Sequence, residues 1–419
     1  MSTLQETIHQ MGSQARAAAH RLSQLSAEEK NGILRAMAAG VRNAADALLE
    51  ANALDLAAGR EKGLSAAMLD RLKLDEARIE AMAAGIDQVA TLPDPVGEVM
   101  EEWERPNGIR IRQVRVPIGT IGIIYESRPN VTADAAVLCF KTGNATILRG
   151  GSEAIHSNRA IAEALQTAGA AEGLPEHAIQ LIPFTDRESV AVLAGMDRWL
   201  DLIIPRGGKG LIETVVSLAR MPVIKHYDGI CHLFVDVAAD PAMAVSLAVN
   251  SKTQKPGVCN ALETLLVHEG IAEEFLPAAA AALREKGVEL RGCGRTAAIL
   301  PDVVPATDED WETEYLDLIL SIKVVDSLKE AVEHINLHGS HHTDVIVTSD
   351  EAAGEHFMRA VDSACVFHNV STRFNDGGEF GFGAEIGIST DKLHARGPMG
   401  LRELTSYQYR VAGAGQVRE

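Results

Sequence analysis

The sequence predicts an α/β protein of two domains, each built on a doubly wound, mostly parallel sheet. The chain has 419 residues, of which 46% are hydrophobic, so it can form more than one core. From residue 119 onward, short apolar runs alternate with stretches of helical spacing, which is the pattern of βαβ units. A second series of the same kind begins near Cys231 and predicts the second domain.

The first hundred residues are expected to be helical. Ser26 and Glu29 form the pattern of a capping box, and apolar residues recur at helical spacing from Ile33 to Leu49. The segment that follows alternates like an exposed strand, with a phase slip near Gln113 that indicates a bulge.

The strands expected in the first α/β series lie at 121–125, 145–148, 179–182, 202–204 and 222–224. Helical spacing at 156–169 and 188–195 separates some of them. The strands expected in the second series lie at 232–235, 262–267, 318–325, 344–347 and 364–367. Helices are expected between them at 242–250, 271–286, 328–335 and 351–361. We therefore assign 1–103 and 117–230 to one domain and 231–385 to another.

Composition excludes several classes of partner. Lys and Arg total 39 against 58 Asp and Glu, and the net charge of −19 argues against binding to nucleic acid or an anionic membrane. The start of the chain lacks the basic and apolar regions of a signal peptide, and no apolar stretch is long enough to predict a membrane span. Five cysteines without paired spacing indicate a reducing compartment such as the cytoplasm, and no structural metal site is expected.

Cys259 is the candidate nucleophile. It follows Pro256 and Gly257, which break regular structure, and precedes an apolar strand-like run. Lys252 and Lys255 lie just upstream and would favour a thiolate. These features predict covalent catalysis on a carbonyl, and burial as a small hydrophobic residue is the alternative. Burial is the expectation for the other four cysteines. They are Cys139, Cys231, Cys293 and Cys365.

Two further segments are rich in residues that bind ligands elsewhere. Gly207, Gly208 and Lys209 follow an apolar run and precede a helical stretch, so they predict either a phosphate-binding turn or a tight turn with exposed basic residues. The segment from His334 to His342 contains four histidines. They span a helix end, a loop and a strand start, so we expect a hydrogen-bonded loop and no metal.

Four segments together resemble the aldehyde dehydrogenase superfamily. They are Tyr125–Thr132, Lys225–Gly229, Gln254–Ala261 and His334–Ile346. Within that superfamily the chain is most similar to the γ-glutamyl phosphate reductase family of proline synthesis, over nearly its whole length. The resemblance implies an aldehyde dehydrogenase-like fold with an NADP-binding domain and a catalytic domain that carries Cys259. It also implies an oligomerisation arm, for which 104–116 and 400–419 are the candidates, the second as a strand donated to a neighbour.

The resemblance also implies the catalytic residues. Cys259 falls where the superfamily carries its nucleophile, and Asn130 matches the asparagine that stabilises the oxyanion with the Cys259 backbone N–H. His226 stands about where hydrolytic members carry a glutamate base, so water is poorly activated to attack a thioester, which is left to phosphate. The alternative is that His226 is itself a general base.

Further residues are implied to bind the cofactor and the substrate. Arg149 suits the 2′-phosphate of NADPH, and an ordinary surface arginine is the alternative. The remaining cofactor-binding candidates are Ser152, Gly207, Gly208, Lys209 and Glu314. Glu314 is implied to contact the nicotinamide ribose. The sequence departs from the family pattern after it, where Leu316 and Asp317 replace an aromatic residue, and this puts the contact in question. Arg128 and Arg396 are both candidates to bind the substrate's α-carboxylate.

The activity that the resemblance implies is the NADPH-dependent reduction of L-glutamyl 5-phosphate to L-glutamate 5-semialdehyde and phosphate, through a thioester on a cysteine. It further implies a homo-oligomer in the cytoplasm with functional coupling to glutamate 5-kinase. Two alternatives stay open. One is an aldehyde dehydrogenase that transfers the acyl group to coenzyme A, and the other is a non-catalytic interaction protein.

Overall fold

The computed structural model describes residues 3–418 and divides the chain into two compact units. The first unit contains Met1–Lys225, Phe382–Gly387 and Met399–Glu419, and the second contains His226–Gly381 and Ile388–Pro398. The division after Lys225 lies a few residues before the expected boundary at 230 and 231, so His226 and Gly229 belong to the second unit.

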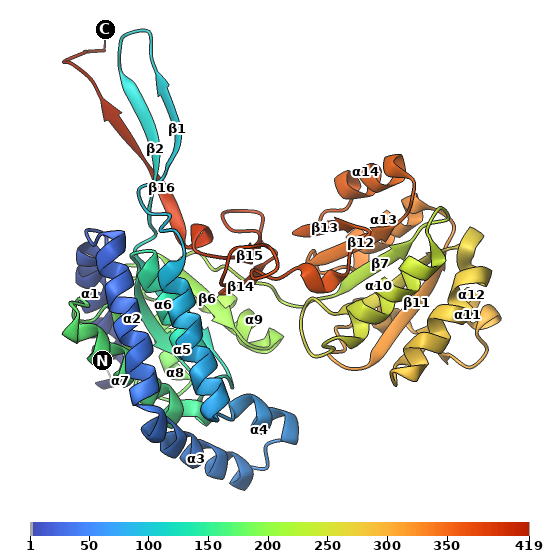
Figure 1. Cartoon of the computed structure of the whole chain (residues 1–419), viewed down its shortest axis with the longest axis horizontal. Helices are drawn as coiled ribbons and strands as arrows, with labels where there is room; N and C mark the ends of the chain where they lie inside the picture. The colour runs from blue at the N-terminus through green and yellow to red at the C-terminus, as the bar shows by residue number, and fades with distance from the viewer. Residues whose placement is uncertain (1–2, 419) are drawn as a thin grey trace. The chain divides into compact units, whose positions relative to one another are not determined.

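A group of helices forms the N-terminal part of the first unit (Figure 1). They are α1 (Thr3–Leu22), α2 (Ala27–Asn43), α3 (Ala45–Glu61), α4 (Ala66–Leu72) and α5 (Glu76–Thr91). The predicted capping box at the start of α2 is confirmed. The Ser26 hydroxyl accepts a hydrogen bond from the Glu29 backbone N–H (3.2 Å), and the Ser26 N–H donates to the Glu29 carboxylate (2.8 Å).

The central sheet of the first unit is parallel, with the strand order β5-β4-β3-β6. Its strands are β3 (Thr120–Tyr125), β4 (Ala145–Arg149), β5 (Ile179–Leu181) and β6 (Leu202–Arg206). The helices around it are α6 (Val131–Lys141), α7 (Ile155–Ala171), α8 (Glu188–Ala194) and α9 (Lys209–Leu218), with the short turn η1 (Ser152–Ala154). The strand predicted at 222–224 is only an isolated bridge between Ile203 and Val223. Since β4 and β6 flank β3 on opposite sides, the sheet is doubly wound, as predicted.

The second unit contains, within the described residues, a seven-stranded parallel sheet of order β10-β9-β11-β8-β7-β12-β13. Its strands are β7 (Cys231–Val235), β8 (Leu262–His268), β9 (Glu289–Gly292), β10 (Val304–Pro305), β11 (Ile319–Val325), β12 (Thr343–Val347) and β13 (Cys365–His368). The helices are α10 (Pro241–Thr253), α11 (Glu269–Glu285), α12 (Gly294–Ile299), α13 (Leu328–His338) and α14 (Glu351–Ala360), with 3₁₀ turns η2 (Asp308–Glu312) and η3 (Thr372–Phe374). Every strand predicted for this series is present, and β9 and β10 are additional.

An antiparallel sheet extends away from the helices of the first unit (Figure 1). It consists of β1 (Val99–Glu104), β2 (Arg110–Pro117) and β16 (Thr405–Ala412), with β2 in the middle. The predicted bulge lies on the partner strand, since the register shifts between Val99 and Glu101, opposite Gln113 and Val114. The C-terminal strand pairs with β2 of its own chain over its full length.

Two short strands, β14 (Gly387–Ser389) and β15 (Gly397–Met399), pair with each other, and the 3₁₀ turn η4 (Arg402–Leu404) precedes β16. Among residues 3–418, no helix is long and apolar enough to cross a membrane.

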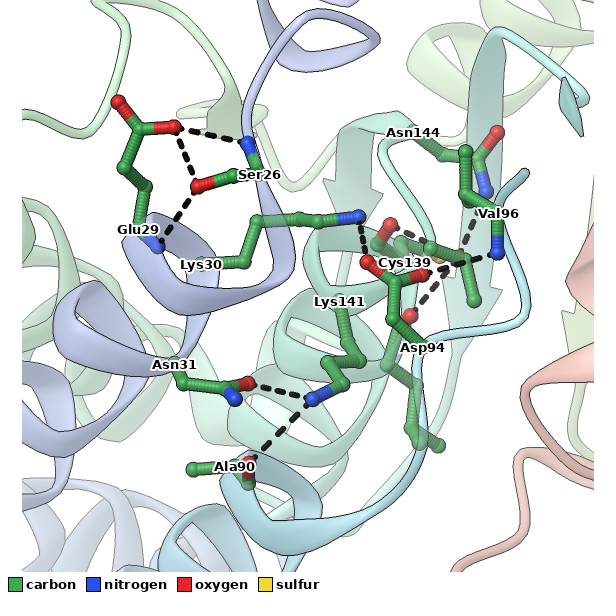
Figure 2. A network of polar contacts seen from close by, with 12 residues as sticks. Ser26, Glu29, Lys30, Asn31, Ala90, Asp94, Val96, Cys139, Lys141 and Asn144 are labelled. Carbon is green, nitrogen blue, oxygen red and sulfur yellow. Dashed lines mark hydrogen bonds and ion pairs between the residues drawn. The ribbon is translucent and has the colours of Figure 1, made fainter. Parts of the chain in front are cut away.

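Two buried lysines connect the helical layer of the first unit (Figure 2). Lys30 on α2 is only 1% exposed and pairs with Asp94, whose carboxylate also accepts a hydrogen bond from the Val96 N–H (3.0 Å). Lys141 at the end of α6 donates to the Asn31 side chain and to the Ala90 carbonyl. Burial lowers the pKa of Lys141. These contacts tie α2 to the end of α5 and to α6, and they serve packing.

Candidate active site

Cys259 lies on a tight turn at the start of a largely buried strand. The turn follows α10, and the Ala261 N–H donates to the Val258 carbonyl (3.0 Å), which places Cys259 and Asn260 at its two central positions. Cys259 is half-buried, whereas the first six residues of β8 behind it are buried. The predicted turn is confirmed, and it holds the half-buried Cys259 next to the buried strand β8.

Two segments meet Cys259 because their strands and β8 begin at the same edge of the parallel sheet. His226–Ile230 precedes β7, Cys259 precedes β8, and His342 precedes β12. In the sheet, β7 lies between β8 and β12. The amino ends of parallel strands share one edge, so these residues gather there. Ligands of open parallel sheets usually bind at the carboxyl ends, so this site is at the opposite edge from the common one.

The backbone of Gly229 packs directly against the backbone of Cys259. A Cβ atom at position 229 would lie 2.0 Å from the Cys259 carbonyl oxygen and 2.5 Å from its Cα, so only glycine fits without a shift of the turn. The Gly229 N–H donates to the Glu314 carboxylate (3.0 Å). Glu314, which was expected near a cofactor ribose, therefore holds the segment that contacts Cys259.

Two histidine rings flank the Cys259 thiol. One nitrogen of His226, one nitrogen of His342 and Cys259 Sγ all lie within 4.8 Å of one another. The two rings pack edge to face with centroids 5.5 Å apart. His226 Nδ1 donates to the Ile388 carbonyl (2.8 Å), since a carbonyl can only accept, so the neutral form of the ring has its lone pair on Nε2. Burial, followed by the nearby His226, holds the pKa of His342 well below its usual value, so its ring is neutral.

A second cysteine lies directly beneath the turn. Cys231 begins β7, is fully buried, and its thiol donates to the Cys259 carbonyl oxygen (3.2 Å). Burial raises the pKa of the Cys231 thiol well above its usual value, so it is a neutral donor and not a thiolate. The expectation that Cys231 is a buried structural cysteine is met.

Lys252 and Glu263 form a buried ion pair that closes the loop carrying Cys259. Lys252 Nζ lies 2.6 Å from the Glu263 carboxylate, and both side chains are 0% exposed. Burial lowers the pKa of Lys252 and raises that of Glu263 to about 7, and their mutual attraction opposes both shifts. Lys252 was expected to favour a thiolate on Cys259, but its charge is already balanced by Glu263. Lys255 is exposed.

The histidines of the segment from His334 to His342 do not form one cluster. His334 is buried against Trp311 and His338, and its Nδ1 lies 3.1 Å from Lys323 Nζ. His341 donates to the Asp362 carbonyl (2.6 Å). Only His342 reaches the Cys259 turn. The sequence expectation of a hydrogen-bonded loop therefore describes most of this segment but misses His342, whose position directly before a buried strand was the available signal.

Asn130 and Arg128 lie in the first unit, on the loop between β3 and α6. The Asn130 amide is exposed and donates to the Asp134 carboxylate (2.7 Å). Burial raises the pKa of Asp134 to about 6. Arg128 is exposed in the same loop. Ser127 has a φ of 45°, a rare conformation for serine, and its N–H and hydroxyl both donate to Glu153 (2.6 and 2.7 Å), which fixes the loop.

Arg149 ends β4 and is only 8% exposed, which excludes the alternative of an ordinary surface arginine. Its guanidinium donates to oxygens of Ser189, Gly150, Thr185 and Asp186, of which the last three are backbone carbonyls. Within residues 3–418, no carboxylate forms an ion pair with it. Burial lowers its pKa. Arg149 is thus a buried cation without a direct counter-charge in the described chain.

Gly207 and Gly208 form the turn between β6 and α9. Gly208 is the N-cap of α9 and makes no side-chain cap, and a Cβ added at Gly208 would meet nothing within 4 Å. The Gly208 N–H donates to the Glu126 carboxylate (2.9 Å). Lys209, at the first position of the helix, and Ser152, after β4, are exposed on the same unit. The start of α9 is therefore a positively polarised helix end, where the Glu126 carboxylate occupies the Gly208 N–H.

Arg396 is placed in the second unit and is paired with an acidic residue. Its Nη2 lies 2.8 Å from the Asp362 carboxylate, which also pairs with Lys392. Lys392 and Arg396 lower the pKa of Asp362 to about 2. A substrate carboxylate would therefore compete with Asp362 for Arg396.

Comparisons with known proteins agree with this architecture. The aldehyde dehydrogenase family model matches residues 2–291. The gamma-glutamyl phosphate reductase of Moorella thermoacetica is 58% identical over 98% of this chain and 99% of its own, and that of Geotalea daltonii is 55% identical over the whole of both chains. The crystal structure of the Thermotoga maritima gamma-glutamyl phosphate reductase superposes with a TM-score of 0.96 at 48% identity, over 98% of this chain and 99% of that one. The expected fold class is thereby confirmed, and the chain belongs to the aldehyde dehydrogenase family, within the branch formed by the gamma-glutamyl phosphate reductases.

Proposed function

We propose that this oxidoreductase reduces L-glutamyl 5-phosphate to L-glutamate 5-semialdehyde with NADPH, in proline biosynthesis. The observation that carries the proposal is full-length identity of 52–58% to curated relatives named gamma-glutamyl phosphate reductase. The partly exposed Cys259 thiol on its rigid turn supports it, because this chemistry needs a nucleophile held at a fixed position.

The proposed reaction has two stages on Cys259. The thiolate attacks the acyl carbon, the bond from that carbon to the phosphate oxygen breaks, and the departing phosphate takes up a proton. Hydride then adds to the thioester carbon, and the resulting oxyanion collapses with cleavage of the C–S bond, which releases the aldehyde and regenerates the thiolate. Covalent capture divides one difficult step into two easier ones. A bound NADPH supplies the hydride.

The first unit offers residues that fit a nicotinamide dinucleotide, the cofactor class of the family. The start of α9 follows β6, at the point where the strand order of the sheet reverses, and such helix ends receive phosphate groups. A phosphate there would take the place of the Glu126 carboxylate at the Gly208 N–H. Arg149 supports the choice of NADP, because a buried guanidinium bonded only to neutral oxygens suits a 2′-phosphate.

Cofactor choice is tested by Arg149→Ala. We expect NADPH binding to weaken by roughly 10- to 150-fold, the equivalent of about 1.5–3 kcal/mol, with a much smaller effect on NADH. Arg159→Ala is the control, since Arg159 is exposed and donates to the Pro183 carbonyl in the same unit. Equal losses of NADPH and NADH would show that Arg149 serves packing alone.

Resolution of the thioester is tested by oxidising glutamate 5-semialdehyde with NADP⁺. The resemblance assigns His226 to about the place where hydrolytic members carry a carboxylate base, and the Ile388 carbonyl holds its ring, so we expect NADP⁺ reduction to depend strongly on added phosphate. His226→Glu should raise the phosphate-independent rate. Rapid oxidation by the unaltered protein in buffer free of phosphate and coenzyme A would contradict the proposal. Stimulation by coenzyme A instead of phosphate would favour an acyl transfer to coenzyme A.

Assembly and location are further parts of the proposal. The arm of β1, β2 and β16 exposes large apolar side chains, among them Trp103, Tyr407, Tyr409 and Val411. Its two outer strands each pair only with β2 within the described residues, so each leaves an open edge. We propose that this arm joins copies of the chain into a homo-oligomer in the cytoplasm. Functional coupling to glutamate 5-kinase, which would supply the acyl phosphate, is the remaining part.

A further inference from the structure

We propose that His226, Cys259 and His342 form a binding site for Zn²⁺ and that the bound ion reversibly blocks Cys259. The ligand atoms of the three side chains all lie within 4.8 Å of one another. Two imidazoles and a thiolate are a donor set that Zn²⁺ prefers. The effect on turnover rests on the proposed function of Cys259, whereas binding of the ion does not.

The second coordination layer is already in place for both histidines. A metal-binding histidine usually donates its other ring N–H to a carbonyl or similar oxygen, which fixes the ring and its tautomer. His226 Nδ1 donates to the Ile388 carbonyl (2.8 Å), and His342 Nδ1 lies 2.7 Å from the Thr343 hydroxyl. The Thr343 hydroxyl is itself held by the Asn375 amide (2.6 Å). Each ring therefore presents Nε2 as the nitrogen for an ion.

His342 provides an independent sign of a missing partner. Its side chain is 0% exposed, and its Nε2 makes no hydrogen bond in the described chain. A buried polar nitrogen without a partner is costly, and it is uncommon in native proteins. Coordination to an ion would satisfy this nitrogen.

The geometry requires only a small adjustment. At Zn–S and Zn–N distances of about 2.3 and 2.0–2.1 Å, ligand atoms around one tetrahedral ion lie roughly 3.3–3.6 Å apart. Shifts of about 1 Å or less per side chain would reach this spacing from the separations present. Zn²⁺ would displace the thiol proton of Cys259, bind Nε2 of both histidines, and keep one position for water or another small ligand. The Cys259 thiolate, which attacks the acyl phosphate in the proposed reaction, would then be coordinated to Zn²⁺.

The test uses Co²⁺ as a spectroscopic substitute for Zn²⁺ in the full-length protein without substrates. We expect one equivalent of Co²⁺ to produce a thiolate-to-cobalt charge-transfer band, which Zn²⁺ then abolishes by displacement. Cys259→Ser should lose the band, and His342→Ala should weaken binding by at least about 100-fold, since loss of a ligand exceeds the effect of losing its outer partner. Cys293→Ser and His338→Ala are matched controls in the same unit and should keep the band.

Persistence of the band in Cys259→Ser, or unchanged affinity in His342→Ala, would overturn the proposal. X-ray absorption of the unaltered, zinc-loaded protein gives a measurement independent of any variant, and it should report one sulfur and two imidazole ligands. A cobalt band in a protein without phosphate-dependent activity would support the metal site and contradict the proposed function. Full phosphate-dependent activity without a cobalt band would support the proposed function and contradict the metal site. If both hold, Zn²⁺ should inhibit turnover, and a chelator should restore it.

Discussion

Cys259 and Cys231 are neighbouring cysteines in the same unit with opposite chemical surroundings. Cys231 begins a central strand, is fully buried, and donates its thiol proton to the Cys259 carbonyl. Cys259 lies on a turn before the adjacent strand, is partly exposed, and is flanked by two histidine rings. If Cys259 is the nucleophile, as proposed, backbone position and solvent access distinguish it from Cys231, since both residues carry a thiol.

The comparison extends to how each cysteine is held. The hydrogen-bonded ladder of the sheet fixes Cys231. The turn that carries Cys259 is held by two contacts outside the strand ladder, the close approach of Gly229 and the ion pair of Lys252 with Glu263. The turn of the proposed nucleophile is thus held by segments far apart in sequence, whereas Cys231 is held by the pairing of a single strand. Three changes test this difference.

The largest effect is expected from Cys259→Ala. Removing the nucleophile should lower turnover by at least about 10⁴-fold and leave the fold and NADPH binding intact. Cys231→Ala should keep most of the turnover and cost about 1 kcal/mol of stability. Phosphate-dependent NADP⁺ reduction and thermal unfolding measure both. Substantial activity in Cys259→Ala would show that Cys259 is not the nucleophile.

A smaller loss of activity is expected from Gly229→Ala. The added methyl group would collide with the Cys259 backbone and displace the thiol, and a shift of about 1 Å can cost roughly 10²-fold in rate. Gly294→Ala is the control, since a Cβ there meets nothing within 4 Å. Steady-state kinetics on both variants should separate them. Equal activity would show that the turn does not depend on Gly229.

The third change, Lys252→Met, is expected to act mainly on stability. It leaves Glu263 buried without its cation, at a cost of roughly 3–5 kcal/mol in the free energy of unfolding. Burial already raises the pKa of Glu263 to about 7, and loss of Lys252 raises it further, because the positive charge of Lys252 favours the ionised carboxylate. When folding raises the pKa of an acid, the free energy of unfolding falls as the pH rises from the pKa of the unfolded state through the pKa of the folded state.

Lys252→Met should therefore be more strongly destabilised at pH 8 than at pH 6, as measured by denaturant unfolding. The double variant Lys252→Met/Glu263→Gln should recover part of the stability and lose this extra dependence on pH, since residue 263 no longer ionises. A single variant as stable as the unaltered protein at both values would show that the pair does not hold the loop.

Much of the fold could be predicted because its strands are local patterns. The buried strands β3, β4, β7, β8 and β12 are short apolar runs, and the sequence places each of them closely. Strand β9 was missed, because its sequence Glu-Leu-Arg-Gly has only one large apolar residue. The run at 222–224 was expected to be a strand, but it makes a single bridge, because its tertiary neighbours and not its composition decide pairing.

Less of the candidate site could be predicted, because it depends on contacts between distant segments. The turn at Cys259 follows from Pro256 and Gly257, and it was foreseen. The role of Gly229 was not, since nothing local shows that its Cα lies against another backbone. Lys252 was expected to favour a thiolate on Cys259. It instead forms an ion pair with Glu263, which lies beyond the turn. His342 was grouped with its sequence neighbours, although the sheet places it beside Cys259.

The most direct test of the central claim is to detect the acyl group on Cys259. The protein is mixed with glutamate 5-semialdehyde and NADP⁺ in phosphate-free buffer, quenched in acid, and examined by intact mass and peptide mapping. We predict one acyl adduct on the peptide containing Cys259, which added phosphate discharges as the acyl phosphate. An adduct on Cys231 or another residue, or turnover without any adduct, would contradict the account.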